Sequence, residues 1–278
     1  MIVDGKVVAQ NNVALFSNSD PIPEFALNTI NLNPRFFDPL TFRTYPKKQD
    51  APYAYVQAVE MYDGYFKRAF HEKLQAHPTE GHLLPDVDSD ILKLVVIDRH
   101  HATTHHGTAY VRGFELKRGA IACTTNCENQ NLVVLGTSDE EIAFAVKAIH
   151  KVGGGFFAVA DGQVLGSVEL AVAGCMSSER WETVAQKSRE LDRIVQKELV
   201  GKDGSDCMKV PFMILSFVGL VGVPDLGITE LGMVHTAKQE LIDVVLEEEE
   251  LSTPSSSDTV ESARVTRVCC RCPRHSQP

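Results

Sequence analysis

Basic residues are scarce relative to acidic ones in this sequence of 278 residues. It contains 27 Lys and Arg against 37 Asp and Glu, which gives a formal net charge of -10 at pH 7. Proteins that bind the phosphate backbone of nucleic acids carry a basic patch or stripe, so this balance argues against a nucleic-acid partner. The remaining composition, 44% hydrophobic and 23% charged residues, is ordinary for a soluble globular protein with a sizeable core.

Long apolar runs are also absent. The longest, residues 210–224, is shorter than the roughly 18 residues that indicate a membrane-spanning helix, and its Pro, Ser and Gly favour a buried strand and turn. The N-terminus lacks the basic region, apolar core and cleavage site of a secretory signal. Seven cysteines, an odd number, then predict reduced thiols in the cytosol. We expect a cytoplasmic protein with no membrane partner.

Several catalytic signatures are missing. The sequence has no His-x-His pair, no Ser-His-Asp elbow, no phosphate loop and no dinucleotide fingerprint. The glycines at residues 153–155 follow a predicted helix, which is the wrong context for a dinucleotide site. Eight strand–helix units of a catalytic barrel are not present either. We therefore assign no catalytic residue, no metal ligand and no cofactor to this chain.

The sequence does contain a β-rich stretch from Asp90 to Gly136. Apolar, β-branched runs alternate there with glycine and polar turns, which predicts strands of one sheet at residues 91–97, 108–116, 119–124 and 132–135. Two polar clusters, residues 98–106 and 126–131, fall between these strands. Loops at strand ends commonly carry function, so we expect a site in these two clusters.

Two helices are predicted after this stretch. Ser138 and Glu141 form a capping box before an apolar stripe that runs to residue 149, and glycine follows at Gly153. A second helix is predicted at residues 179–199, capped by Ser177 or Ser178. Between the helices, an Asp-Gly pair predicts a hairpin of residues 156–160 and 163–170, and a later apolar run predicts a strand at residues 212–218.

The N-terminal part is patterned differently. Residues 1–16 alternate as a β-hairpin, and a hairpin alone is marginal in water, so it needs a neighbouring sheet. Residues 17–52 are rich in Pro and Asn and predict a linker held on a surface by Phe25, Phe36, Phe37 and Phe42. Residues 53–76 fit either a helical face or two strands around Asp63-Gly64. Residues 247–278 are polar and Ser-rich and predict a disordered tail.

Several ordered motifs carry a family resemblance. They are DILK at residue 90, the Asp98-Arg99-His100 triplet, VRGFELKRGAIA, NLVVLGTSDEE, VDGKVVA near the start, GGGFFAVADGQVLGSVELAVAGCMSSE, PFMILSF and VPDLGIT. From Ile2 to about Val234 the chain resembles the C-terminal domain of the adenine deaminases, in the metal-dependent amidohydrolase superfamily. This resemblance favours strands at residues 53–76.

The resemblance also implies an activity. The family hydrolyses adenine to hypoxanthine and ammonia in purine salvage, at a divalent metal (Mn, Fe or Zn) held by a barrel. In the family a segment like VDGKVVA follows that barrel, and here it starts at residue 2. We therefore expect the C-terminal portion only, inactive alone and binding adenine only if a barrel is supplied. Its expected partners are a barrel-containing chain or a second copy.

Four residues are candidates for a substrate or interface role. Arg99 and His100 match the family's acidic-Arg-His triplet; the alternative is a solvated polar loop. The four histidines of HHATTHH, from residue 100 to 106, could also bind Zn²⁺ or Ni²⁺. In the second loop the family often carries two histidines in a pattern like HDSHN. They fall on Cys127 and Gln130 here, whereas Glu128 and Asn131 keep the acid and the amide. The alternative for this loop is a tight structural turn.

The sequence as a whole predicts an α+β domain at residues 53–246, with a mixed sheet and two main covering helices. An orphaned β-hairpin and a Pro-rich linker precede it. The function expected from the resemblance is that of an adenine deaminase C-terminal domain. Two alternatives stay open: a non-catalytic accessory or oligomerisation module, and a small metal-binding protein that uses its His and Cys clusters, including Cys269, Cys270 and Cys272.

Overall fold

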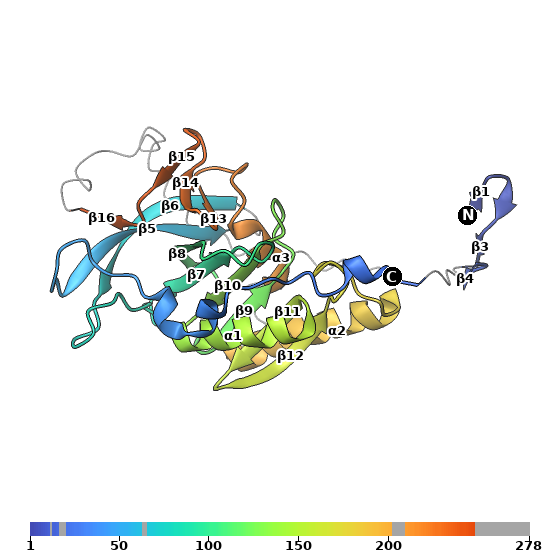
Figure 1. Cartoon of the computed structure of the whole chain (residues 1–278), viewed down its shortest axis with the longest axis horizontal. Helices are drawn as coiled ribbons and strands as arrows, with labels where there is room; N and C mark the ends of the chain where they lie inside the picture. Colours follow the sequence, from blue (N-terminus) through green and yellow to red (C-terminus); the bar gives the residue numbers. More distant parts are fainter. Residues whose placement is uncertain (12, 17–20, 63–65, 202–208, 248–278) are drawn as a thin grey trace, which may run out of the picture. The chain divides into compact units, whose positions relative to one another are not determined.

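A computed structural model describes residues 1–11, 13–16, 21–62, 66–201 and 209–247 (Figure 1). The chain divides into two compact units, Met1–Leu246 and Glu247–Pro278. Apart from Glu247, the second unit lies outside the described residues, and so do the predicted tail and its cysteine cluster. No helix among the described residues is long and apolar enough to cross a membrane.

A nine-stranded mixed sheet forms the centre of the first unit (Figure 1). Its strands are β5 (Tyr53–Tyr62), β6 (Phe66–Gln75), β7 (Leu92–Ile97), β8 (His106–Arg112), β9 (Ala120–Cys123), β10 (Leu132–Gly136), β11 (Gly155–Ala160), β12 (Gln163–Glu169) and β16 (Val245–Leu246). The spatial order is β12-β11-β9-β10-β7-β8-β5-β16, with β6 also pairing with β5. β5 and β8 are parallel, and the other pairs described are antiparallel. The predicted fold class is therefore confirmed.

The central strands β7, β9 and β10 are buried along their whole length because both faces of the sheet are covered. Side chains alternate between the two faces with the period of a strand. Val95 and Val134 face one apolar cluster, whereas Val96 and Val133 face the other. The four strands predicted between residues 91 and 135 are thus present, although β8 begins and ends earlier than expected.

One face is covered by α1 (Asp139–Val152) and by two short turns, η2 (Pro34–Phe37) and η3 (Pro39–Phe42). The helix begins where the capping box predicts, because Ser138 Oγ accepts a hydrogen bond from the Glu141 N–H at 3.3 Å. It ends at Gly153, whose φ of 83° suits glycine.

The other face is covered by α2 (Trp181–Ile194), the π-helical turn η4 (Val195–Val200), α3 (Pro211–Val218) and a three-stranded sheet. That small sheet consists of β13 (Leu226–Thr229), β14 (Gly232–His235) and β15 (Glu240–Ile242). The small sheet was not predicted, because its strands are only three or four residues long.

Two predictions in this layer are wrong. Residues 212–218 form the helix α3 rather than a strand, because a short continuous apolar run does not distinguish a buried strand from a buried helix. The second helix is not capped by Ser177 or Ser178. It begins at Trp181 after Arg180, which makes no side-chain cap, and Ser177 Oγ instead accepts from the Glu179 N–H at 3.2 Å.

The N-terminal hairpin does not join the large sheet. β1 (Ile2–Val3) pairs with β2 (Lys6–Val7), and β3 (Ala9–Gln10) pairs with β4 (Val13–Ala14), as two separate two-stranded sheets. Their side chains are almost all exposed. The prediction of an orphaned hairpin is therefore confirmed for the described residues.

The Pro-rich segment packs through some of its predicted anchors. Besides η2 and η3 it forms the turn η1 (Glu24–Ala26). Phe36 and Phe42 are fully buried and Phe37 packs beside them, but Phe25 is 86% exposed, so its predicted anchoring role is wrong. Residues 53–76 form β5 and β6, as the resemblance favoured, and the predicted Asp63-Gly64 turn lies outside the described residues.

Candidate functional site

The loop of residues 124–131, between β9 and β10, brings the four candidate residues together. Arg99 follows β7, and its side chain is buried with 2% exposure. Its guanidinium donates hydrogen bonds to the Gln130 carbonyl, to the Ala173 carbonyl at 3.1 Å and to Cys175 Sγ at 3.3 Å. Burial lowers the pKa of Arg99, and nearby Cys175 opposes that shift. Arg99 therefore fastens the loop to the segment that follows β12.

His100 binds the same loop at Asn129, one residue before the Gln130 carbonyl that Arg99 binds. Its Nε2 lies 2.8 Å from the Asn129 carbonyl oxygen, so this nitrogen is the donor. Its backbone N–H donates to Asp98 Oδ1 at 2.9 Å, and Thr103 Oγ1 donates to Asp98 Oδ2 at 2.7 Å. Burial alone would raise the pKa of Asp98, but these hydrogen bonds lower it below its ordinary value. Asn31 of the Pro-rich segment donates to the His100 carbonyl at 3.1 Å.

Glu128 and Asn131 contact the small three-stranded sheet and the segment just before it. The carboxylate of Glu128 accepts the Val221 N–H at 3.0 Å and the Gly222 N–H at 3.1 Å, just before β13. Asn131 Nδ2 donates to Glu230 Oε2 at 2.7 Å, in the turn between β13 and β14. Asn131 is buried, and its Oδ1 has no hydrogen-bond partner.

Lys67 was not among the predicted site residues. It lies on β6 and is 5% exposed. Its ammonium group donates to the Leu220 carbonyl. Burial lowers the pKa of Lys67 to about 8, while Glu128 and Asp225 act in the opposite direction. No local pattern marks Lys67 in the sequence, because it is exceptional only through the segments that cover it.

The four histidines of the HHATTHH stretch do not converge on one point. His101 and His105 are exposed, whereas His106 packs edge-on against Phe36 and Phe42 with ring centroids 5.6 and 5.8 Å apart. Burial lowers the pKa of His106, which favours its neutral form. The metal-binding interpretation of this stretch therefore has no geometric support in the described residues.

Together, these contacts make the loop a rigid polar structure. All four candidate side chains bind backbone groups or neighbouring side chains. Those partners lie in the loop itself, after β12 and on either side of β13. Within the part of the chain that the structure describes, they do not form a nucleophile with an adjacent base. Their arrangement holds the loop against the segments around it.

A family model described as "Adenine deaminase C-terminal domain" matches residues 68–240, which include the whole loop and its partners on either side of β13. The chain belongs to the adenine deaminase family. The resemblance seen in the sequence motifs is thereby confirmed, and so is the assignment to the C-terminal domain of that family.

Curated relatives extend the match beyond that domain. The adenine deaminase of Clostridium botulinum strain Langeland is 33% identical over 250 residues, 89% of this chain and 40% of the relative. That of Dehalococcoides mccartyi strain BAV1 is 33% identical over 240 residues, 86% and 39%. Adenine deaminase 2 of Carboxydothermus hydrogenoformans is 35% identical over 246 residues, 87% and 40%. The chain thus spans about two fifths of the length of these adenine deaminases.

Proposed function

We propose that this chain acts as the C-terminal part of an adenine deaminase, which hydrolyses adenine to hypoxanthine and ammonia once a metal-binding barrel is supplied. The chain alone does not turn over adenine. The proposal is supported by the family match and by the name of the relatives, adenine deaminase. Its role in the reaction is to present the loop of residues 124–131 in one fixed conformation.

The geometry of this loop is the observation that carries the proposal. Arg99 precedes the loop in sequence and Glu128 lies within it. Arg99 donates to two backbone carbonyls and to Cys175 Sγ, and Glu128 accepts two backbone N–H groups. A loop held this firmly gives up little entropy when it contacts a second surface.

The loop itself does not fit the metal of the family reaction. Hydrolysis of this kind uses a metal-activated water, which needs free imidazole and carboxylate ligands. The only imidazole among the four candidates, that of His100, donates to a carbonyl, and the carboxylate of Glu128 accepts two N–H groups. We therefore assign no step at this loop to a metal.

The test joins this chain to the barrel. A chimera carries the preceding part of the Clostridium botulinum enzyme ahead of this chain, and adenine loss is followed by absorbance after loading with Mn²⁺, Fe²⁺ or Zn²⁺. We expect turnover by the chimera and none by this chain alone. Arg99→Lys in the chimera should reduce turnover, because lysine cannot reproduce the guanidinium's divergent hydrogen bonds.

Two results would contradict the proposal. One is metal-dependent turnover by this chain alone that is lost on chelation. The other is a chimera no more active than the barrel portion without this chain. Lys73→Met, an exposed change on β6, serves as the matched control and should leave the chimera's activity unchanged.

A second candidate function is a non-catalytic assembly module. It is favoured by the N-terminal hairpin, whose Ile2, Val7 and Val13 are exposed and whose strands do not pair with the large sheet. Exposed strand edges bind further strands by β-augmentation. Self-association measured by sedimentation should weaken in Val7→Pro, since proline removes a backbone donor. A monomer with slow hydrogen exchange across residues 2–11 would exclude this candidate.

A further inference from the structure

The connection between β6 and β7 contains a tight turn, residues 77–82, with the sequence His-Pro-Thr-Glu-Gly-His. Its two ends are joined by a hydrogen bond from the His77 N–H to the His82 carbonyl at 2.7 Å. The Gly81 N–H donates to the His77 carbonyl at 2.9 Å, and Gly81 adopts a φ of 73° that suits glycine. The backbone therefore holds the two imidazoles opposite each other, stacked with centroids 5.1 Å apart and planes 8° apart.

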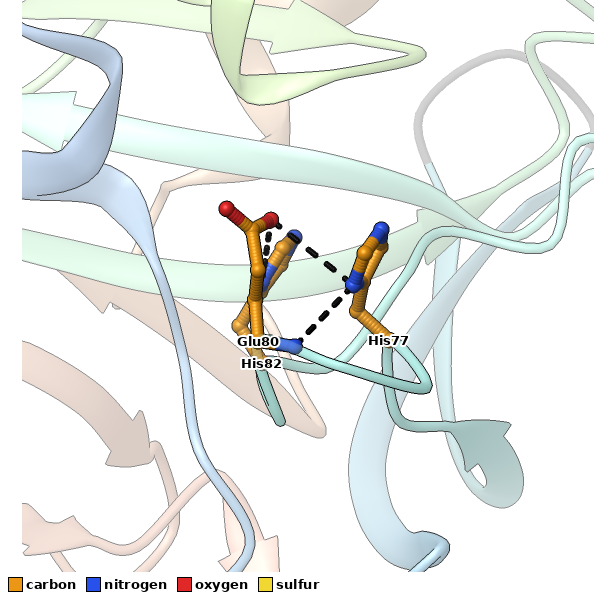
Figure 2. A group of neighbouring side chains, drawn as sticks. All are labelled: His77, Glu80 and His82. Atoms are coloured by element: carbon orange, nitrogen blue, oxygen red, sulfur yellow. Dashed lines mark hydrogen bonds and ion pairs between the residues drawn. The ribbon is translucent and has the colours of Figure 1, made fainter.

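A carboxylate lies beside both rings. Glu80 Oε2 is 3.7 Å from His77 Nδ1 and 3.7 Å from His82 Nδ1 (Figure 2). Ligand atoms of the three residues all lie within 4.8 Å of one another. In a tetrahedral zinc site with bonds of about 2.0–2.2 Å, ligand atoms are roughly 3.3–3.5 Å apart. An inward movement of the three side chains, with a rotation of the two stacked rings that directs both Nδ1 lone pairs at one ion, would therefore complete the coordination.

His82 supplies the second observation. The residue is only 7% exposed, and its Nδ1 is buried without a hydrogen-bond partner. Buried polar atoms in native proteins are almost always satisfied, so an open ring nitrogen aimed at a carboxylate indicates a missing ligand.

We propose that His77, Glu80 and His82 bind a divalent cation of the zinc class. Two imidazole nitrogens and one carboxylate oxygen form a borderline donor set, which suits Zn²⁺ better than Mg²⁺ or Ca²⁺. Three protein ligands leave one tetrahedral position for water. The site lies on the β6–β7 turn and uses none of the residues of the loop at 124–131, so it stands apart from the proposed deaminase function.

Existing hydrogen bonds to Glu80 and to His77 compete with the cation. Arg43 Nη2 donates to the same Glu80 Oε2 at 3.0 Å, and His77 Nδ1 accepts long hydrogen bonds from the Thr79 and Glu80 N–H groups at 3.4 and 3.2 Å. The side chain of Glu80 is 44% exposed, so it can turn its second oxygen toward Arg43 while the first binds the cation. This competition yields a specific expectation: removing the guanidinium should strengthen binding.

The experiment is a calorimetric titration of the full chain with ZnCl₂. Cysteines elsewhere in the chain can also bind zinc, so the readout is the difference in zinc stoichiometry between wild type and the double variant His77→Asn/His82→Asn. We expect wild type to bind one more zinc ion per chain than the double variant. Glu80→Gln should weaken this binding at least about tenfold, and Arg43→Gln should tighten it. Co²⁺ bound at this site should lack the charge-transfer absorption of thiolate ligation.

The controls separate binding from folding. His101→Asn changes an exposed histidine outside the group and should retain the full stoichiometry and affinity. Melting temperatures measured without metal show whether each variant folds, and Glu80→Gln is an isosteric change at a half-exposed position. Equal stoichiometry in wild type and the double variant would overturn the proposal. The proposal would also be overturned if the two single variants, Glu80→Gln and Arg43→Gln, both folded and both bound zinc with the wild-type affinity.

Discussion

The ammonium group of Lys93 lies 2.6 Å from Oδ1 of Asp139, and both side chains are buried. Lys93 also donates to the Phe42 carbonyl at 3.1 Å. This ion pair joins β7 at the centre of the sheet, the first turn of α1 and the end of η3. Burial lowers the pKa of Lys93, and Asp139 only partly opposes that shift. The charge of Lys93 is therefore tolerated because Asp139 is beside it.

Asp139→Asn should destabilise the chain strongly. Removing one partner leaves a buried charge without compensation, which costs about 3–5 kcal/mol. Lys93→Met combined with Asp139→Asn should recover most of that loss, because an apolar side chain needs no counter-ion. Urea unfolding measures all three. Glu140→Gln, an exposed neighbour, is the control and should have little effect; equal losses in the single and double variants would contradict the ion-pair argument.

Lys67 should make stability depend on pH. Burial lowers its pKa from the ordinary 10.5 to about 8. Between these values the unfolded chain keeps the Lys67 proton and the folded chain releases it, so the free energy of unfolding rises with pH. The rise is at most about 3 kcal/mol. It should disappear in Lys67→Met but persist in Lys73→Met, which alters an exposed lysine of the same strand. Denaturant unfolding measured between about pH 8 and pH 10.5 checks this prediction. The same dependence of the unfolding free energy on pH in Lys67→Met and Lys73→Met would refute it.

Asp192 on α2 lines an apolar pocket with Phe156, Leu191 and Phe212. Burial raises its pKa from 3.8 to about 6. The folded chain thus binds the extra proton between these values, and stability falls as pH rises through them.

Asp192→Asn should therefore stabilise the chain at about pH 7.5 by roughly 1 kcal/mol, less than the full linkage value because the side chain is partly solvated. The gain should vanish near about pH 2.5, where both states are protonated. Thermal or urea unfolding at the two pH values measures it. Glu190→Gln on the exposed side of α2 should show no such pH-dependent gain.

Phe36→Ala should loosen the Pro-rich segment. Phe36 is fully buried, stacks on Phe42 with centroids 6.2 Å apart and packs against His106. Loss of a buried aromatic ring costs about 3–5 kcal/mol through lost burial and the cavity left behind. Phe25→Ala, at an exposed position, should change stability by less than about 0.5 kcal/mol. Similar losses for both would show that the segment does not pack as described.

Local patterns predicted the sheet and its first helix well. The capping box at Ser138 and Glu141 and the glycine at Gly153 place both ends of α1, because capping depends on residues adjacent in the chain. The same local reasoning was wrong at residues 212–218, where an apolar run buried on all sides has no periodicity to distinguish strand from helix. Phe25 was taken for an anchor by its residue type alone.

By itself, the sequence determined the family, the four strands β7 to β10 and the two polar loops that carry Arg99 and Glu128. These follow from motifs and periodicities within short windows. Only the tertiary structure decided what those residues do and which others join them. Lys67, Cys175 and Glu230 come from distant segments, and His77 and His82 face each other only because the turn closes. Burial and charge pairing depend on neighbours in space, which no local pattern contains.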